Sequence, residues 1–141
     1  MSIFLDGAIA MKRLLFLLLL TVCSVSWAKW QFLYATDEAD HYVDKSTIRR
    51  NGGVAKMWYV HDFFETETNS AENKYKSVKV REAFNCMEET SAIIAFYQYS
   101  GSIGGGSVVN SHERKESEWN WKSIVPGSLS EDLWKIACGK K

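Results

Sequence analysis

Strand-like runs fill most of this chain and leave room for one helix. From Trp30 onward, segments rich in aromatic and β-branched residues recur between short polar turns. The clearest turn is Asn51-Gly52-Gly53, because Asn-Gly between two strand-like runs is the strongest short-range signal of a β-hairpin. The pattern predicts an antiparallel sheet of about six strands and excludes a coiled coil or a multi-pass membrane protein.

The longest strand is expected at residues 54–64 and is apolar on both faces. One face carries Tyr59 and Phe63, and the other carries Trp58. A strand of this kind belongs in the middle of a sheet that is covered on both sides. Further strands are expected at residues 30–36, 75–86, 92–99 and 107–109. The remaining segments predict a solvated loop at 65–74, a flexible glycine-rich turn at 101–106 and an exposed charged stretch at 112–118.

One helix is expected near the end of the chain, after Ser128. Ser128 and Glu131 have the spacing of a capping box, and Gly139 is typical of a helix C-terminus. The apolar residues fall on one side at helical spacing. They are Leu129, Leu133, Ile136 and Ala137. The fold class is therefore α+β, with one C-terminal helix packed on a face of the sheet.

Composition narrows the function classes. The 141 residues carry 17 Lys and Arg against 17 Asp and Glu, and 46% of them are hydrophobic. This balance is that of a globular protein, and no net positive charge favours a nucleic-acid partner.

The first 28 residues predict an N-terminal extension followed by a signal peptide. Met11 to Arg13 gives a basic start, an apolar run follows, and Ser26-Trp27-Ala28 provides small residues at the −3 and −1 positions. The apolar run is shorter than the roughly 20 residues that a membrane-spanning helix requires. We therefore expect cleavage before Lys29, a single domain at residues 29–141 and no transmembrane segment after cleavage.

Two alternatives about this segment stay open. Leu20 to Cys23 resembles a lipid-attachment box, although Val22 is larger than the residue that normally precedes a lipidated cysteine. The start of translation is Met1 or Met11. The predicted location is the periplasm, with the outer-membrane surface as the alternative.

Two cysteines, Cys86 and Cys138, remain after removal of the signal. An even number of cysteines in an exported chain favours a disulfide between them, which would tie the helix to the sheet. The rival interpretation is a nucleophile or metal ligand, but neither a CxxC spacing nor a histidine cluster supports it.

No arrangement of side chains predicts catalysis, metal binding or a cofactor. His41 and Asp44 lie an odd number of residues apart, so on a strand they point to opposite faces, as do His61 and Asp62. The glycine-rich segment 101–106 lacks the lysine and helix of a phosphate-binding loop. The expected protein is not an enzyme.

Aromatic side chains give a candidate interaction surface. They exceed what one sheet face can bury under one short helix, and aromatic residues are enriched in protein interfaces. Either they fill a dense core, or one sheet face stays exposed and binds a second copy or another protein. The candidate residues are Trp58, Tyr59, Phe63, Tyr97 and Tyr99.

An ordered set of motifs resembles the surface-adhesin protein E family over nearly all of residues 29–141. It comprises Tyr42-Val43-Asp44, then 46–52 and Met57-Trp58, later Tyr75-Lys76-Ser77, Cys86, a glycine-rich turn, Trp119 or Trp121, Val125-Pro126-Gly127-Ser128 and a helix ending in Cys138. The resemblance implies a six-stranded sheet with a disulfide-linked helix, a homodimer and an envelope location. In the family's named member it also implies binding of host matrix and serum proteins.

Two hypotheses about function follow. The first is a non-enzymatic, adhesin-like module that binds host proteins or another envelope protein. The second is a soluble periplasmic domain that binds a small ligand or assists another protein.

The processing site gives the first testable prediction. N-terminal sequencing of the exported protein should read Lys-Trp-Gln-Phe, because Ser26 and Ala28 are the small residues after the apolar run. Recovery of a lipid-modified Cys23 would contradict it.

Overall fold

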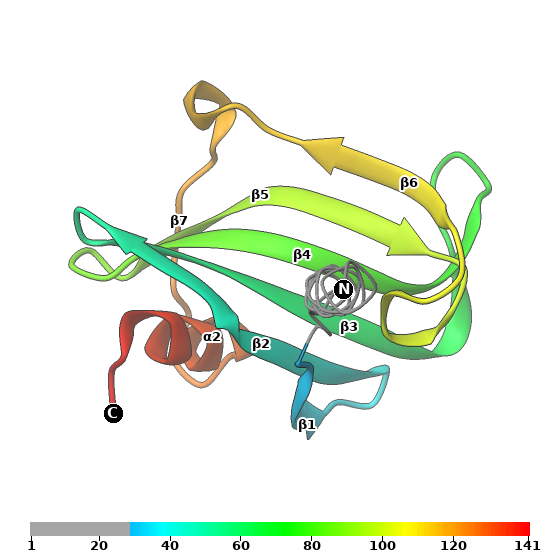
Figure 1. The fold of residues 1–141 in the computed structure, drawn as a ribbon, viewed down its shortest axis with the longest axis horizontal. Helices are drawn as coiled ribbons and strands as arrows, with labels where there is room; N and C mark the ends of the chain where they lie inside the picture. Colours follow the sequence, from blue (N-terminus) through cyan, green and yellow to red (C-terminus); the bar gives the residue numbers. More distant parts are fainter. Residues whose placement is uncertain (1–28) are drawn as a thin grey trace, which may run out of the picture.

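A computed structural model of the chain describes residues 29–141, so the predicted signal peptide lies outside the described residues. Residues 29–141 form a seven-stranded antiparallel sheet with one α-helix. Figure 1 shows how these elements are arranged. Strands β1 to β6 are neighbours in chain order, and β7 pairs with β5 beside β6. The predicted fold class is confirmed. None of the described helices is long and apolar enough to cross a membrane.

The elements have the following bounds. The strands are β1 Gln31–Ala35, β2 Ala39–Asn51, β3 Val54–Thr68, β4 Lys74–Asn85, β5 Thr90–Tyr99, β6 Val108–Glu113 and β7 Lys122–Ser123. Two 3₁₀ turns, η1 Ser102–Gly104 and η2 Glu116–Glu118, lie before and after β6, and the helix is α2 Leu129–Cys138.

The β2–β3 hairpin turns at Gly52 and Gly53, as predicted. Their φ angles are +59° and +81°, and Asn51 pairs with Val54 across the turn. Two consecutive positive φ angles characterise the tight turns that suit the twist of a hairpin, and glycine adopts them without steric cost.

A bulge in β2 then changes the register of this hairpin. Arg49 pairs with Lys56, but Asp44 pairs with Trp58, so the intervening residues of β2 bulge out of the ladder. Asp44 Oδ1 accepts a hydrogen bond from the Ser46 backbone N at 3.0 Å, and Thr47 Oγ1 accepts one from the Trp58 backbone N at 3.0 Å. These bonds between side chains and the backbone hold the bulge in place.

Two predicted loops are shorter than expected. Strand β3 extends to Thr68 and β4 begins at Lys74, so only residues 69–73 remain as a loop between them. Strand β6 extends to Glu113 and takes in part of the predicted charged stretch. In these polar segments the strands continue because their backbones pair with a neighbouring strand. Their sequences do not alternate between apolar and polar residues, so the extensions could not be predicted.

The glycine-rich turn after β5 is held against the sheet. The Ile103 backbone N donates to Asp62 Oδ1 at 3.1 Å, and the Gly104 backbone N donates to Ser77 Oγ at 2.8 Å. Gly104 has a φ of +71°, and a Cβ there would lie 2.1 Å from Lys79 Cε. The segment predicted to be a flexible turn is therefore packed on β3 and β4.

Helix α2 covers one face of the sheet, which we call the helix face. Leu133, Trp134 and Ala137 of the helix pack against a buried cluster that includes Met57 and Phe84. Fully burying a side chain such as Leu133 stabilises the fold by about 2 kcal/mol. The opposite face, which carries Lys56, Trp58, Lys79, Arg81 and Tyr97, is called the outer face.

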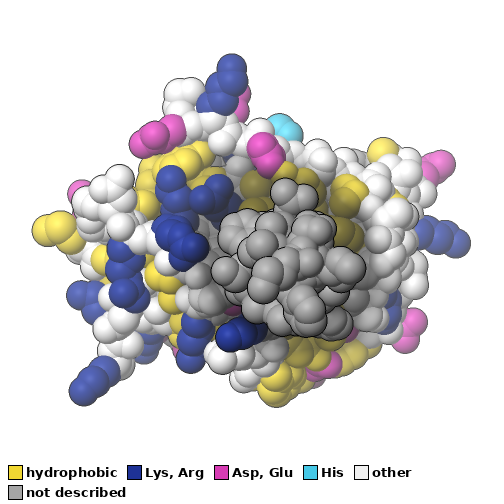
Figure 2. All heavy atoms as spheres, viewed as in Figure 1, with side chains coloured by type: hydrophobic (Ala, Val, Ile, Leu, Met, Phe, Trp, Pro, Cys, Tyr) yellow, Lys and Arg dark blue, Asp and Glu magenta, His cyan; other side chains and the backbone are white. Residues whose placement is uncertain are grey.

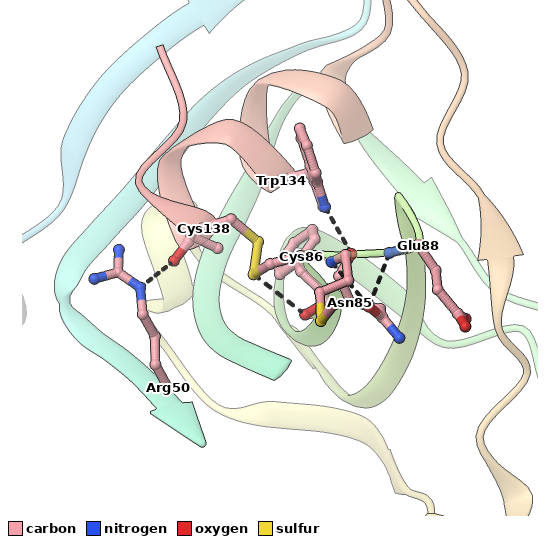
Figure 3. Close-up of a disulfide and its surroundings, with 9 residues drawn as sticks. Arg50, Asn85, Cys86, Glu88, Trp134 and Cys138 are labelled. Atoms are coloured by element: carbon pink, nitrogen blue, oxygen red, sulfur yellow. Dashed lines mark hydrogen bonds between the residues drawn. A yellow bond between two sulfur atoms is a disulfide. The ribbon is translucent and has the colours of Figure 1, made fainter. Parts of the chain in front are cut away.

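The disulfide between Cys86 and Cys138 is present and joins the end of β4 to the last residue of α2 (Figure 3). Its two Cα atoms lie 5.5 Å apart. Trp134 Nε1 donates to the Asn85 carbonyl at 2.9 Å, and Arg50 Nε donates to the Ala137 carbonyl at 2.9 Å. Arg50 thus places a positive charge at the negative end of the helix dipole.

The disulfide should contribute strongly to stability. Its closed loop spans 52 positions, for which chain entropy gives a contribution of about 4 kcal/mol. Replacing both cysteines by serine should lower the melting temperature by roughly 10 °C or more in a thermal scan. Reduced wild-type protein serves as the control and should melt near the double variant. An unchanged melting temperature would show that the bridge is unimportant.

Candidate functional site

Aromatic side chains converge on the outer face and line a cavity of about 330 Å³, here called the aromatic cavity. Trp58 comes from β3, Tyr97 and Tyr99 come from β5, and Trp30 comes from the segment before β1. The ring centroids of Trp58 and Tyr97 are 5.9 Å apart. The cavity is lined besides by Asp44, Thr47 and Lys79.

Cations lie over these rings. Lys79 Nζ is 4.8 Å from the Tyr99 ring centroid and 5.7 Å from that of Trp30. The Arg81 guanidinium lies 6.0 Å from the Trp58 ring. Such contacts orient the rings and leave the charged groups near solvent.

The structure separates the five predicted interface residues. Trp58, Tyr97 and Tyr99 lie together in the aromatic cavity. Tyr59 is on the helix face, is 5% exposed and belongs to the core cluster. Phe63 shares the helix face, where its ring lies 5.8 Å from that of Tyr75. The alternation along residues 54–64 already placed Trp58 opposite to Tyr59 and Phe63.

A second cavity of about 420 Å³, here called the basic cavity, lies beside the first on the outer face. Arg49, Lys56 and Arg81 line it together with one acid, Glu116. Its other lining residues are Asn51, Val54, Trp119 and Trp121. Figure 2 shows Lys and Arg side chains gathered beside hydrophobic ones on this side of the molecule.

Sequence reasoning did not find these cations. Lys56 and Arg81 lie in separate strand-like runs, and Trp119 and Trp121 precede Val125-Pro126-Gly127. Their convergence depends on strand register and on the path of the chain after β6. The bulge in β2 does not affect this cavity, because Arg49 and Asn51 lie between the bulge and the turn and keep the register of the tight hairpin.

A histidine pair on the helix face was also missed. His41 and His61 are register partners, and their Nδ1 atoms lie 2.7 Å apart. His41 Nε2 is 3.2 Å from Thr36 Oγ1. Burial lowers the pKa of both histidines, and that of His61 falls to about 4 with a further contribution from His41. His41 and Asp44 do lie on opposite faces, as predicted.

Glu82 is a buried acid in a third cavity near the start of α2. Tyr59 Oη donates a hydrogen bond to Glu82 Oε2 at 2.6 Å. Burial raises the pKa of Glu82, while hydrogen bonds from Ser91 and Tyr59 lower it in part. Within residues 29–141, no cluster of three or more His, Cys, Asp or Glu side chains is placed to hold a metal ion.

Comparison with known proteins identifies relatives of this fold. The family model described as "Surface-adhesin protein E" matches residues 28–139. No curated protein matches the chain by sequence.

Solved structures of protein E from Haemophilus influenzae are similar. The structure from a non-typeable strain has a TM-score of 0.56 and 13% identity, over 82% of this chain and 79% of that one. A second crystal form has a TM-score of 0.60 and 15% identity, over 80% of this chain and 89% of that one. At this identity the likeness concerns the fold.

The buried histidines should make the fold sensitive to acid. The pKa of His61 is depressed from its ordinary value of 6.5 to about 4, so between these values the unfolded chain binds a proton that the native state excludes. The free energy of unfolding should fall by up to about 3 kcal/mol as the pH decreases through this range. His61→Gln should reduce this loss in thermal scans at pH 7, 5.5 and 4.

Variants must be compared because Glu82 changes the free energy of unfolding in the opposite direction as the pH decreases. A raised carboxyl pKa stabilises the native state at low pH and loses that contribution as the pH increases. Exposed His112 gives a matched control, and His112→Gln should follow the wild-type curve. Equal acid sensitivity of wild type and His61→Gln would refute the role of His61.

Proposed function

Because this chain belongs to the surface-adhesin protein E family, we propose that it is an exported, non-enzymatic binding module of the bacterial cell envelope. In this proposal it attaches to proteins through the aromatic cavity. The partner is a host matrix or serum protein, or another protein of the envelope. Family membership supports an adhesin-like role.

One observation carries the proposal: three aromatic rings from β3 and β5 meet Trp30 on the sheet face that lacks the helix. Aromatic side chains bury large areas at small entropic cost, and they dominate the energetic centres of protein interfaces. A partner side chain that enters the cavity would contact the rings of both Trp58 and Tyr97. The cations at the rim, Lys79 and Arg81, would select partners with acidic neighbouring groups.

We propose a second copy of the chain as the other partner for this surface, so that the outer face would form a homodimer. A two-fold interface uses the same patch on both copies, and a central aromatic cluster suits this arrangement. Burial of apolar area contributes about 25 cal/mol per Å². The cavity also suits the alternative of a small-ligand-binding periplasmic domain, because its volume of about 330 Å³ lies within the range of small-molecule sites.

Export with cleavage before Lys29 remains part of the proposal. The Lys29 backbone N lies 3.2 Å from Asp44 Oδ2, and Asp44 is 3% exposed. After cleavage this nitrogen would be a charged amino group and would form an ion pair with the carboxylate. Periplasm and outer-membrane surface are distinguished by fractionation of the cell envelope.

The binding role can be tested with Trp58→Ala and Tyr97→Ala. Light scattering of the exported wild-type protein at micromolar concentration should give about twice the mass of one processed chain. Each substitution should weaken self-association by tenfold or more, because truncation at the centre of an interface costs over 2 kcal/mol in typical cases. Laminin and vitronectin, presented separately, should be retained by wild type and less by the variants.

Met87→Ala is the matched control, since Met87 is an apolar side chain 85% exposed in the β4–β5 turn, away from the cavity. It should behave as wild type. A monomer that retains neither protein but binds a small molecule in the aromatic cavity would favour the alternative function.

A further inference from the structure

The basic cavity has features of a site for a ligand other than a protein partner. We propose that it binds an anionic polysaccharide, with sulfate or carboxylate groups on the cations and a sugar ring against the tryptophans. The proposal goes beyond the protein-binding role above, and the residues that test it do not line the aromatic cavity. Its cavity of about 420 Å³ falls within the roughly 300–1,000 Å³ typical of small-molecule sites.

The first argument is the arrangement of charge. Arg49 on β2 and Lys56 on β3 are direct register partners, and like charges at such positions destabilise a sheet. Arg81 lies diagonally across from Lys56, because Lys56 pairs with Ala83 and Trp58 pairs with Arg81. Three cations therefore share one small area of the outer face.

These cations are not neutralised within the described chain. Among residues 29–141, the one ion pair within 4 Å joins Lys135 to Glu131, and neither of these residues lines the cavity. The Arg49 guanidinium donates instead to the carbonyls of Ser46 and Ile48, both at 2.9 Å. One acid, Glu116, lines the cavity against three bases. A bound anion would relieve the repulsion and form charge-assisted hydrogen bonds with the guanidinium groups.

The second argument is the pair of indole rings beside the cations. The rings of Trp119 and Trp121 lie 6.0 Å apart with an interplanar angle of 66°, and Trp121 is 38% exposed. Trp119 Nε1 donates to the Arg114 carbonyl at 3.3 Å, and Lys56 Nζ lies 5.1 Å from the Trp119 ring. The rings are thus held in place and present apolar surface next to positive charge. A sugar ring with an acidic substituent has the complementary pattern, one apolar face and one anionic edge.

Two other ligand classes fit less well. Protein interfaces are depleted of lysine at their centres, whereas Lys56 lies between Arg49 and the Trp119 ring. Proteins that bind nucleic acid without sequence preference carry an excess of positive charge, and this chain has 17 bases and 17 acids. A polysaccharide can also extend along the outer face, because Arg81 connects the basic cavity to Trp58 of the aromatic cavity.

The test uses a heparin hexasaccharide with the exported protein in titration calorimetry. We expect binding that weakens as salt is added, since exposed charges are screened. Lys56→Gln should weaken binding by tenfold or more, the loss expected for one charged hydrogen bond. Trp121→Ala should also weaken it, and this loss should persist at high salt. Neither residue lines the aromatic cavity, so self-association tests the other proposal separately.

The controls separate the site from a general attraction of charges. Lys74→Gln removes an exposed lysine near the other end of β4 and should leave the affinity unchanged. Lys56→Gln should not lower the melting temperature, because it relieves a like-charge contact. No binding of the hexasaccharide, or equal binding of uncharged dextran, would overturn the proposal. So would equal losses in Lys56→Gln and Lys74→Gln, or tighter binding of oligothymidine, which would indicate a nucleic-acid site.

Discussion

This sheet has two faces, and the described chain supplies one ten-residue helix to cover them. That constraint shapes the rest of the molecule. On the helix face, Leu133, Trp134 and Ala137 of the helix pack over Met57 and Phe84 of the sheet. The outer face has no second apolar layer from the described residues. It is instead built from tryptophan, tyrosine, lysine and arginine, whose side chains bury their stems and rings while the polar ends reach solvent. Both candidate sites therefore lie on the face of the sheet that the helix does not cover.

Local signals were sufficient for much of the fold. The Gly52-Gly53 turn, the Ser128 cap and the end of α2 at Gly139 depend on one or two residues each, and all are present as expected. The Cys86–Cys138 pairing followed from the cysteine count alone. The alternation of residues 54–64 correctly divided their side chains between the faces. These features need no knowledge of distant contacts.

What the sequence could not provide is the register between strands. Extending the tight hairpin without interruption would place His41 opposite Phe64, but the bulge held by Asp44 and Thr47 places it opposite His61. The same shift sets Asp44 opposite Trp58 and so builds one wall of the aromatic cavity. Similarly, the basic cavity combines β2, β3 and β4 with the segment after β6. Each contributing residue looks ordinary within its own segment, and the site exists only after folding.

The position of the disulfide has a consequence for the integrity of the chain. Residues between Cys86 and Cys138 form a covalently closed loop that includes β5, β6, the η2 turn and most of α2. A single proteolytic cut anywhere in that loop, for example in the exposed stretch around η2, leaves both fragments joined through the sulfur atoms. Tyr97, Tyr99, Trp119 and Trp121 all lie within the loop. A nicked molecule would thus retain every residue of both cavities until it met a reductant.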